Sequence, residues 1–326
     1  MGPKDGYQSA IEKQGSGARR TLLWSALRMI AENDKKKTTN RPHVLLLDEP
    51  ELCLHPNAVR EACKVLYDLP TTGGWQVMVT THSPAFIDIS KDNTTIVRVE
   101  RSDDGEIIGT TVFRPEKVQL DENDRENLKL LNLFDPYVAE FFFGGCSIIV
   151  EGDTEYTAFK YVISKNPDKY KNIHIIRARG KATIVSLCKI LNHFGSGYSV
   201  LHDSDLPLTN KGDKKNPAWS QNIEILKVVK SSPTPNNIRL IASVPNFEEA
   251  YFNQSISKGK PYNALVQLQK NQQIFKTVEQ LLDALIDFSV DAPPGSLEWE
   301  NEHQLLELVS SFAQTASSAE KYDVES

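Results

Sequence analysis

Short apolar segments that end in acidic residues recur along this chain, and amphipathic helical segments separate them. Residues 44–47 (VLLL) and 75–81 (WQVMVTT) flank a helix-like segment at 57–69, which is the pattern of a β-α-β unit. The pattern begins again at 146–150 (CSIIV) and continues in apolar segments at 173–178, 198–203 and 238–243. This alternation predicts an α/β protein with buried parallel strands.

Composition excludes several classes of protein. The chain has 326 residues, of which 40% are hydrophobic and 25% charged, so we expect about two globular domains. The net charge of -6 gives no positive field that would draw the whole molecule to nucleic acid, so any phosphate contact must be local. The four cysteines form no C-x-x-C pair, which excludes a compact zinc ribbon and gives no disulfide framework. Neither a signal-peptide core nor an apolar run of ~18 residues is present, so we expect a cytoplasmic protein that makes no membrane contact.

The pattern divides the chain into five expected regions. We expect a first α/β region that ends in a hairpin around Asp104-Gly105, then a linker helix, a second α/β domain, a helical segment without strands, and a disordered polar tail. The corresponding ranges are 1–115, 116–145, 146–260, 261–314 and 315–326.

Three motifs in the first region are typical of nucleotide chemistry. An apolar strand ends in Asp48 and Glu49, His82 follows the next strand, and Ser16 and Gly17 lie where QGSGARR opens a helix whose backbone amides suit an anion. Each motif alone has a bland explanation, a turn or a linker. In this order and spacing they resemble the Walker B segment, switch histidine and signature of ABC-type ATPases. The resemblance implies that Asp48 binds magnesium and that Glu49 polarises the attacking water.

The chain has no G-x-x-x-x-G-K-[ST] segment, the loop that cradles nucleotide phosphates. We therefore expect residues 1–115 to be the C-terminal half of an ATPase domain that does not hydrolyse ATP by itself. The ABC resemblance implies a homodimer through the full ATPase domain, with ATP bound only when the N-terminal half is present.

Acidic residues follow two strands of the second region. Glu151 comes directly after the strand SIIV, and Glu155 lies in the first turn of the next helix, where its carboxylate can face the same sheet edge. A favourable interaction with the helix dipole explains Glu155 but not Glu151. Asp203 and Asp205 end a later strand, and their i, i+2 spacing puts both carboxylates on one side. Together these oxygen ligands suit magnesium or manganese.

A glutamate after the first strand and a D-x-D after a later one resemble a Toprim domain. With Glu155 and the ATPase half in front, residues 14–265 are similar to the OLD (overcoming lysogenization defect) family of ATP-linked nucleases, in the class encoded beside a helicase and akin to Gabija-type phage defence. The resemblance implies a metal-dependent DNA endonuclease in phage defence or DNA repair, with a helicase as a candidate partner.

The same resemblance implies two further site residues. In VPNFEEAYF (244–252) we prefer Glu248 over Glu249 as a metal ligand because Glu248 follows the family-like Asn-Phe. In SKGKPYNAL (257–265) we prefer Lys260 over Lys258 as the catalytic lysine, with a solvated surface lysine as the competing interpretation.

The implied mechanism is two-metal hydrolysis with Glu151 at its centre. One Mg²⁺ or Mn²⁺ ion lowers the pKa of the attacking water, and a second ion about 4 Å away stabilises the departing 3′ oxygen. Lys260 neutralises charge on the phosphorane oxygens. Local DNA contacts are expected from the segment RARGKAT, through Arg177, Arg179 and Lys181, although an exposed loop without DNA is an equally open interpretation.

Two other classes of function compete with a nuclease. A topoisomerase needs a tyrosine nucleophile, and a bacterial-type primase usually carries a cysteine-rich zinc module; no residue pattern here marks either. A non-catalytic module for DNA clamping or dimerisation is the second alternative. It is disfavoured because five acidic groups in one cleft repel one another unless a metal is bound.

Overall fold

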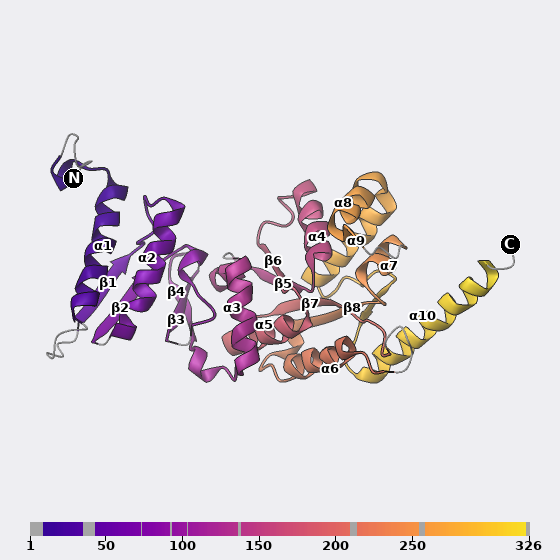
Figure 1. The fold of residues 1–326 in the computed structure, drawn as a ribbon. Helices are drawn as coiled ribbons and strands as arrows, with labels where there is room; N and C mark the ends of the chain where they lie inside the picture. The colour runs from indigo at the N-terminus through magenta and orange to yellow at the C-terminus, as the bar shows by residue number, and fades with distance from the viewer. Residues whose placement is uncertain are drawn as a thin grey trace. The chain divides into compact units, whose positions relative to one another are not determined.

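The computed structural model describes residues 9–34, 43–72, 74–91, 93–102, 104–135, 138–208, 214–253 and 258–323. The chain divides into two compact units, Met1–Asp88 and Ile89–Ser326. Each unit is built from strands and helices (Figure 1), which confirms the predicted α/β class. None of the helices within the described ranges is long and apolar enough to cross a membrane.

The first unit contains two parallel strands, β1 (His43–Asp48) and β2 (Trp75–Thr80), joined through α2 (Pro56–Asp68). Helix α1 (Ser16–Asp34) precedes them, and short 3-10 turns span Ile11–Lys13, Pro70–Thr72 and Pro84–Phe86. One face of the strands packs Leu45, Leu47, Val77 and Val79 against a buried core that includes Trp24 and Leu66. The β-α-β unit predicted from residues 44–81 is therefore present.

The second unit is organised around a five-stranded sheet with the order β6-β5-β7-β8-β9. Four strands are parallel, and β9 pairs antiparallel with β8. The strands are β5 (Cys146–Val150), β6 (Ile173–Arg177), β7 (Tyr198–Asp203), β8 (Ile238–Ser243) and β9 (Ser296–Glu298). The interior strands are almost entirely buried because helices cover both faces of the sheet.

Helices α4, α8 and α9 lie over one face of this sheet, and α3, α5 and α6 lie toward the other (Figure 1). The first face is closed by a core in which Ile148 and Val150 of β5 meet Phe159 of α4 and Leu281 of α9. The helices are α3 (Glu122–Phe134), α4 (Asp153–Lys165), α5 (Lys181–Phe194), α6 (Pro217–Lys230), α7 (Phe247–Phe252), α8 (Lys260–Lys270), α9 (Gln272–Ile286) and α10 (Glu302–Asp323), with 3-10 turns at Pro115–Lys117, Val138–Phe143 and Pro235–Asn237.

The hairpin of β3 (Ile96–Arg101) and β4 (Ile107–Phe113) belongs to the second unit and not, as predicted, to the ATPase region. Its Phe113 is fully buried and contacts the rings of Phe142 and Phe194. The first unit therefore ends at Asp88 instead of residue 115. Alternating apolar residues predict a hairpin but do not tell which core its buried face joins.

Two other predicted regions also differ from the structure. Helix α3, expected as a linker, packs on α5 with Leu128 and Leu131 buried, and its Asp124 accepts a 2.7 Å hydrogen bond from Ser186. The segment after residue 260 was expected to lack strands, yet it contains β9. Helix α10 continues to Asp323, through most of the tail predicted as disordered; residues 324–326 lie outside the described ranges. Its Ala, Glu and Lys residues are good helix formers, which the low hydrophobicity of the tail obscures.

Candidate functional site

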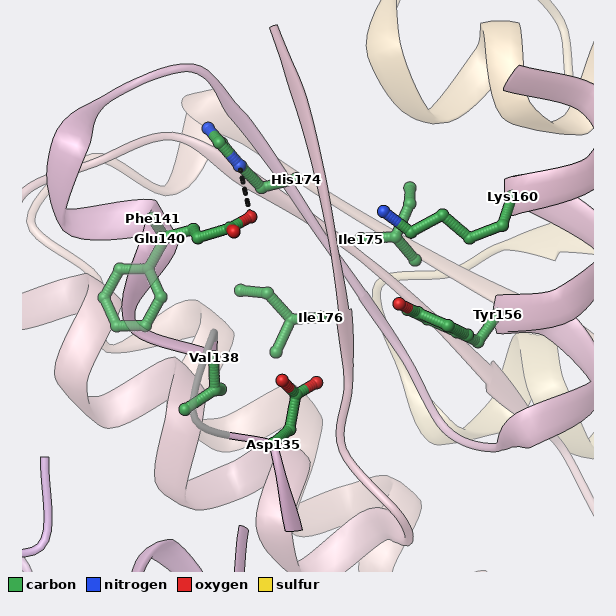
Figure 2. Close-up of a pocket in the computed structure, with 9 residues that line it drawn as sticks. All are labelled: Asp135, Val138, Glu140, Phe141, Tyr156, Lys160, His174, Ile175 and Ile176. Atoms are coloured by element: carbon green, nitrogen blue, oxygen red, sulfur yellow. Dashed lines mark ion pairs between the residues drawn. The ribbon is translucent and has the colours of Figure 1, made fainter. Parts of the chain in front are cut away.

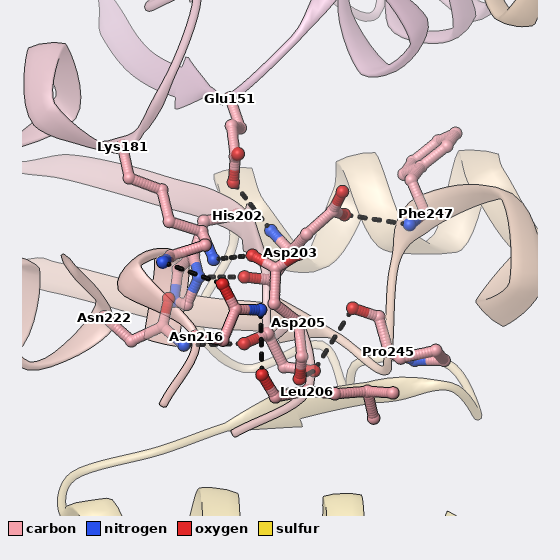
Figure 3. Close-up of polar contacts among 12 residues, drawn as sticks. Glu151, Lys181, His202, Asp203, Asp205, Leu206, Asn216, Asn222, Pro245 and Phe247 are labelled. Atoms are coloured by element: carbon pink, nitrogen blue, oxygen red, sulfur yellow. Dashed lines mark hydrogen bonds and ion pairs between the residues drawn. The ribbon is translucent and has the colours of Figure 1, made fainter. Parts of the chain in front are cut away.

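The carboxyl ends of β5 and β7 bring two predicted site residues together. These strands are parallel neighbours with Val150 opposite Leu201, so the residues that follow them meet at one sheet edge. The backbone N–H of Asp203 donates a 3.0 Å hydrogen bond to Oε2 of Glu151, as Figure 3 shows. Glu151 is thus held at the edge by the segment that carries the D-x-D.

Glu155 lies in the first turn of α4 and is only 4% exposed. Gly152 leaves room for it, since a Cβ at that position would lie 3.1 Å from Glu155 Oε2. Burial, together with the charges of Glu151 and Glu248, raises the pKa of Glu155 to about 7. Glu155 is therefore a buried acid within the cluster and not a solvated carboxylate at a helix start.

Glu248 is buried in the first turn of α7. Its Oε1 accepts a 3.0 Å hydrogen bond from the Thr154 hydroxyl, and its Oε2 accepts one of 3.1 Å from Lys260 Nζ. Glu249 instead bonds the side chain of Asn246, the residue that caps α7. Between the two glutamates considered, Glu248 is the one whose carboxylate contacts α4 and Lys260.

Asp203 is the electrostatic centre of the group. Burial raises its pKa well above the usual value, and the charges of four other carboxylates add to the rise: those of Glu155, Glu151, Asp205 and Glu248. Its Oδ1 accepts a 2.8 Å hydrogen bond from the backbone N–H of Phe247, which ties the end of β7 to the start of α7. The other four predicted metal-ligand residues therefore all lie close enough to Asp203 to raise its pKa.

Two lysines are paired with this cluster. Lys260, the first residue of α8, bonds Glu248 while 43% of its side chain stays exposed. Burial works against its charge, but the hydrogen bond that Lys260 donates to Glu248 and the charges of Glu248, Asp203 and Glu155 raise the pKa of Lys260. Lys181 is buried and forms an ion pair with Asp205. Lys181 is therefore paired inside the cluster and is not free at the surface, and its predicted contact with DNA stays a prediction.

The other two predicted DNA contacts lie near the surface. Arg177 donates a 2.9 Å hydrogen bond to Asp153 Oδ1 and lies over the ring of Tyr156, 5.0 Å from its centroid. Arg179 is exposed and takes a left-handed conformation, with φ of 60°, just before α5. Their DNA-binding role remains a prediction.

The donor set fits a hard divalent cation, because it consists of carboxylate oxygens that raise one another's pKa. Among the residues that the structure describes, however, no three His, Cys, Asp or Glu side chains converge closely enough to hold one ion. Two of the five carboxylates are instead paired with Lys181 and Lys260.

A buried network supports the D-x-D loop, and the sequence did not predict it. His202 is fully buried, and its Nε2 accepts a 3.1 Å hydrogen bond from Nε1 of Trp299, just after β9. Nδ1 must then carry the ring proton, which it donates over 2.8 Å to the carbonyl of Asp203. Burial and the nearby Lys181 ammonium lower the pKa of His202 to about 3, so the ring stays neutral. A histidine among the apolar residues of YSVLHD is the available sequence signal.

The residues after Asp203 are held just as closely (Figure 3). Asn222 donates a 2.6 Å hydrogen bond to the carbonyl of Ser204. Asp205 has a left-handed φ of 56°, and its N–H bonds the carbonyl of Pro245 at 2.9 Å. These contacts fix the direction of both aspartates without using their own carboxylates.

A separate hollow lies beside the edge strand β6 (Figure 2). It is a cavity of about 160 Å³ between the 138–143 turn, β6 and α4, where His174 Nδ1 lies 3.6 Å from Glu140 Oε2. None of the predicted site residues lines it. The residues that do are Asp135, Val138, Glu140, Phe141, Tyr156, Lys160, His174, Ile175 and Ile176.

In the first unit, the predicted ATPase residues follow β1 and β2. Glu49 Oε1 lies 3.4 Å from His82 Nε2, and the Thr80 hydroxyl donates to Asp48. Glu51 accepts hydrogen bonds from the Thr81 hydroxyl at 2.6 Å and from the His82 N–H at 3.1 Å. The strand ends thus place the acids predicted as Walker B beside the histidine, as their parallel register requires.

The helix that carries the predicted signature packs against the same loop. Ser16 begins α1, and a Cβ at Gly17 would lie 2.9 Å from the Cys53 carbonyl, which explains a glycine there. Arg20 donates hydrogen bonds of 2.9 and 3.1 Å to the carbonyls of Glu49 and Pro50. Arg20 therefore joins two of the motifs, a function that no motif signals.

Known proteins resemble both units. The AAA ATPase domain family matches residues 4–87, and the family described as overcoming lysogenization defect protein-like, TOPRIM domain, matches residues 142–205. The OLD nuclease of Thermus scotoductus is 30% identical over 52% of this chain and 33% of its own length. The Old nuclease of Escherichia phage P2 is 26% identical over 60% of this chain and 33% of its own length. The endonuclease GajA of Bacillus cereus is 24% identical over 65% of this chain and 34% of its own length.

The chain spans about a third of the length of these relatives. An ATPase region is confirmed, although the matching family is AAA and the ABC subdivision remains a prediction. The chain therefore carries an AAA ATPase region followed by the Toprim domain of the OLD-like family.

Proposed function

We propose that the second unit is a metal-dependent DNA endonuclease whose active site is the carboxylate cluster at the ends of β5, β7 and β8. The observation that carries this proposal is the position of Asp203, whose pKa is raised by burial and by four neighbouring carboxylates. A fold does not retain such repulsion for stability alone, so a bound cation is the simplest reason for it. The names of the relatives, two nucleases and an endonuclease, support the same reaction.

Glu151, Glu155, Asp203, Asp205 and Glu248 would hold Mg²⁺ or Mn²⁺. When bound, the metal supplies an activated water and neutralises charge at the scissile phosphate. The Asp203 N–H orients Glu151, and the Phe247 N–H orients Asp203. Glu155, with a pKa of about 7, holds a proton in much of the metal-free protein at neutral pH.

Lys260 is the better candidate for contact with the phosphate. Its ammonium is partly exposed beside Glu248, so it can reach a substrate oxygen without leaving the cluster. Arg177 ends β6 and Arg179 follows it, at the same edge of the sheet, and both would contact neighbouring phosphates.

The larger assembly is a proposal from the relatives and the resemblance. ATP binding would require a phosphate-binding loop from outside this chain, and the homodimer would form through the complete ATPase domain. A role in phage defence or DNA repair, with a helicase partner, is proposed from the family resemblance of the sequence alone.

The test is cleavage of supercoiled plasmid with Mn²⁺ or Mg²⁺, with and without EDTA. Wild-type protein should nick or linearise the plasmid only with metal, and Asp203→Asn should be inactive. Glu224→Gln removes an exposed carboxylate from α6 and should cut normally. Cleavage that survives EDTA, or an active Asp203→Asn variant, would contradict the proposal. A folded wild type that binds DNA but never cuts would favour a clamping module.

A further inference from the structure

Lys181 is built into the candidate site and does not project from it. It begins α5 directly after Gly180, whose φ of 127° suits glycine, and only 4% of its side chain is exposed. Figure 3 shows the side chain extending toward the D-x-D loop, where its ammonium pairs with Asp205 Oδ2. Burial raises the pKa of Glu151, and this ammonium partly offsets the rise, so it lies within reach of two cluster acids.

A buried ammonium is stable only when an acceptor compensates for the lost water. Here the acceptor is held in place independently, because the left-handed backbone of Asp205 and its bond to the Pro245 carbonyl fix the loop. The Lys181–Asp205 pair is thus an ion pair with a buried ammonium and a fixed acceptor, unlike a mobile ion pair at the surface.

The carboxylate that accepts the Lys181 hydrogen bond is one of the five that would hold a divalent cation. Lys260 has the same relation to Glu248 on the other side of the cluster. This arrangement accounts for the fact that, in the described part of the chain, the acids do not converge three at a time. The ammonium groups of Lys181 and Lys260 each supply a positive charge to one of these acids.

We propose that Lys181 is a resident counter-ion of the metal-free site, which occupies a cation position on Asp205 and is displaced when a divalent ion binds there. The inference rests on the proposed metal-dependent function. It has two consequences: Lys181 stabilises the metal-free fold, and it weakens metal binding because the ion must compete with it.

Lys181→Met tests both consequences, because methionine fills similar space without the charge. We would measure Mn²⁺ binding by electron paramagnetic resonance and calorimetry, and thermal unfolding with and without Mn²⁺. The metal-free variant should melt below wild type. Its Mn²⁺ dissociation constant should fall about tenfold, the worth of one charge-assisted hydrogen bond that no longer has to be broken. Mn²⁺ should therefore raise its melting temperature more than that of wild type.

Lys189→Met is the matched control. Lys189 lies on the same helix and pairs with the buried Asp124, away from the cluster. This variant should also lose stability, but its Mn²⁺ affinity should equal that of wild type. Should Lys181→Met not fold, Lys181→Gln removes the charge while keeping a hydrogen-bond donor, and the same tightening is expected.

The outcomes separate this inference from the proposed function. Wild type that binds no Mn²⁺ would refute the proposed function, and the inference with it. Wild type that binds Mn²⁺, with equal or weaker binding by Lys181→Met or Lys181→Gln, would refute the inference alone. Asp205→Asn should weaken Mn²⁺ binding, and unchanged binding by that variant would also overturn the assignment of Lys181.

Discussion

Replacing Glu155 by glutamine probes how much the carboxylate cluster destabilises the metal-free protein. Glu155 is 4% exposed, and burial raises its pKa from 4.5 to about 7. Because the folded-state pKa is raised, the favourable contribution of the neutral acid is fully present below pH 4.5 and is lost as the pH rises through about 7. At ~1.4 kcal/mol per pH unit, the loss is on the order of 3 kcal/mol.

Glutamine keeps the shape and cannot ionise, so Glu155→Gln should escape this loss. In EDTA, the variant should match wild type near pH 5 and exceed it at pH 8 by up to about 3 kcal/mol. At ~2–4 °C per kcal/mol for a domain of this size, its melting temperature at pH 8 should be roughly 6–12 °C higher. Thermal unfolding followed by circular dichroism at a series of pH values measures both quantities.

Glu224→Gln makes the same charge change at a half-exposed position on α6 and should leave the pH dependence of wild type intact. The reasoning fails if Glu155→Gln is equally stabilised at pH 5 and pH 8, or if it is less stable than wild type at pH 8. Either result would mean that Glu155 does not carry a pH-dependent burial cost.

Three further substitutions test separate parts of the structure. Lys260→Ala should lower the plasmid cleavage rate about 10²–10³-fold with little change in melting temperature, whereas Lys258→Ala should cut like wild type; exchange of these two results would move the lysine assignment by two residues. Trp299→Phe leaves His202 Nε2 without its donor and should cost about 1–3 kcal/mol in urea unfolding, more than Trp219→Phe, whose N–H bonds the exposed Glu302. Arg239→Ala removes hydrogen bonds to Glu298 and to the carbonyls of Ala284 and Val290, and should lower the free energy of unfolding by about 3–5 kcal/mol. A decrease below about 1 kcal/mol would show that this buried cation does not hold β9 to β8.

The positions of the acids could be predicted because parallel strands constrain them. Once 146–150 and 198–203 are recognised as neighbouring strands, Glu151 and Asp203 must emerge at one edge of the sheet. In the structure the backbone N–H of Asp203 donates a 3.0 Å hydrogen bond to Oε2 of Glu151. The same register places Asp48 and Glu49 near His82 in the first unit. These are consequences of chain direction, which an apolar pattern reveals.

Contacts between segments far apart in the chain could not be predicted from the sequence. Lys181 sits in RARGKAT with two arginines, so its charge indicates DNA, yet its side chain turns inward to Asp205. The three-residue strand β9 is too short for any periodicity, although Trp299 beside it reaches the D-x-D loop through His202. The burial of Phe113 by a neighbouring helix likewise decides where the hairpin belongs. Each of these depends on tertiary packing and not on local pattern.

The most direct test of the metal-dependent site is a crystal of the protein soaked in Mn²⁺, with the ions located by anomalous scattering. The account predicts two manganese peaks at the carboxyl ends of β5, β7 and β8, bounded by Glu151, Glu155, Asp203, Asp205 and Glu248, with the Lys181 ammonium moved away from Asp205. Manganese absent from this edge at saturating concentration, or bound elsewhere while the cluster keeps its two lysine pairs, would contradict the account.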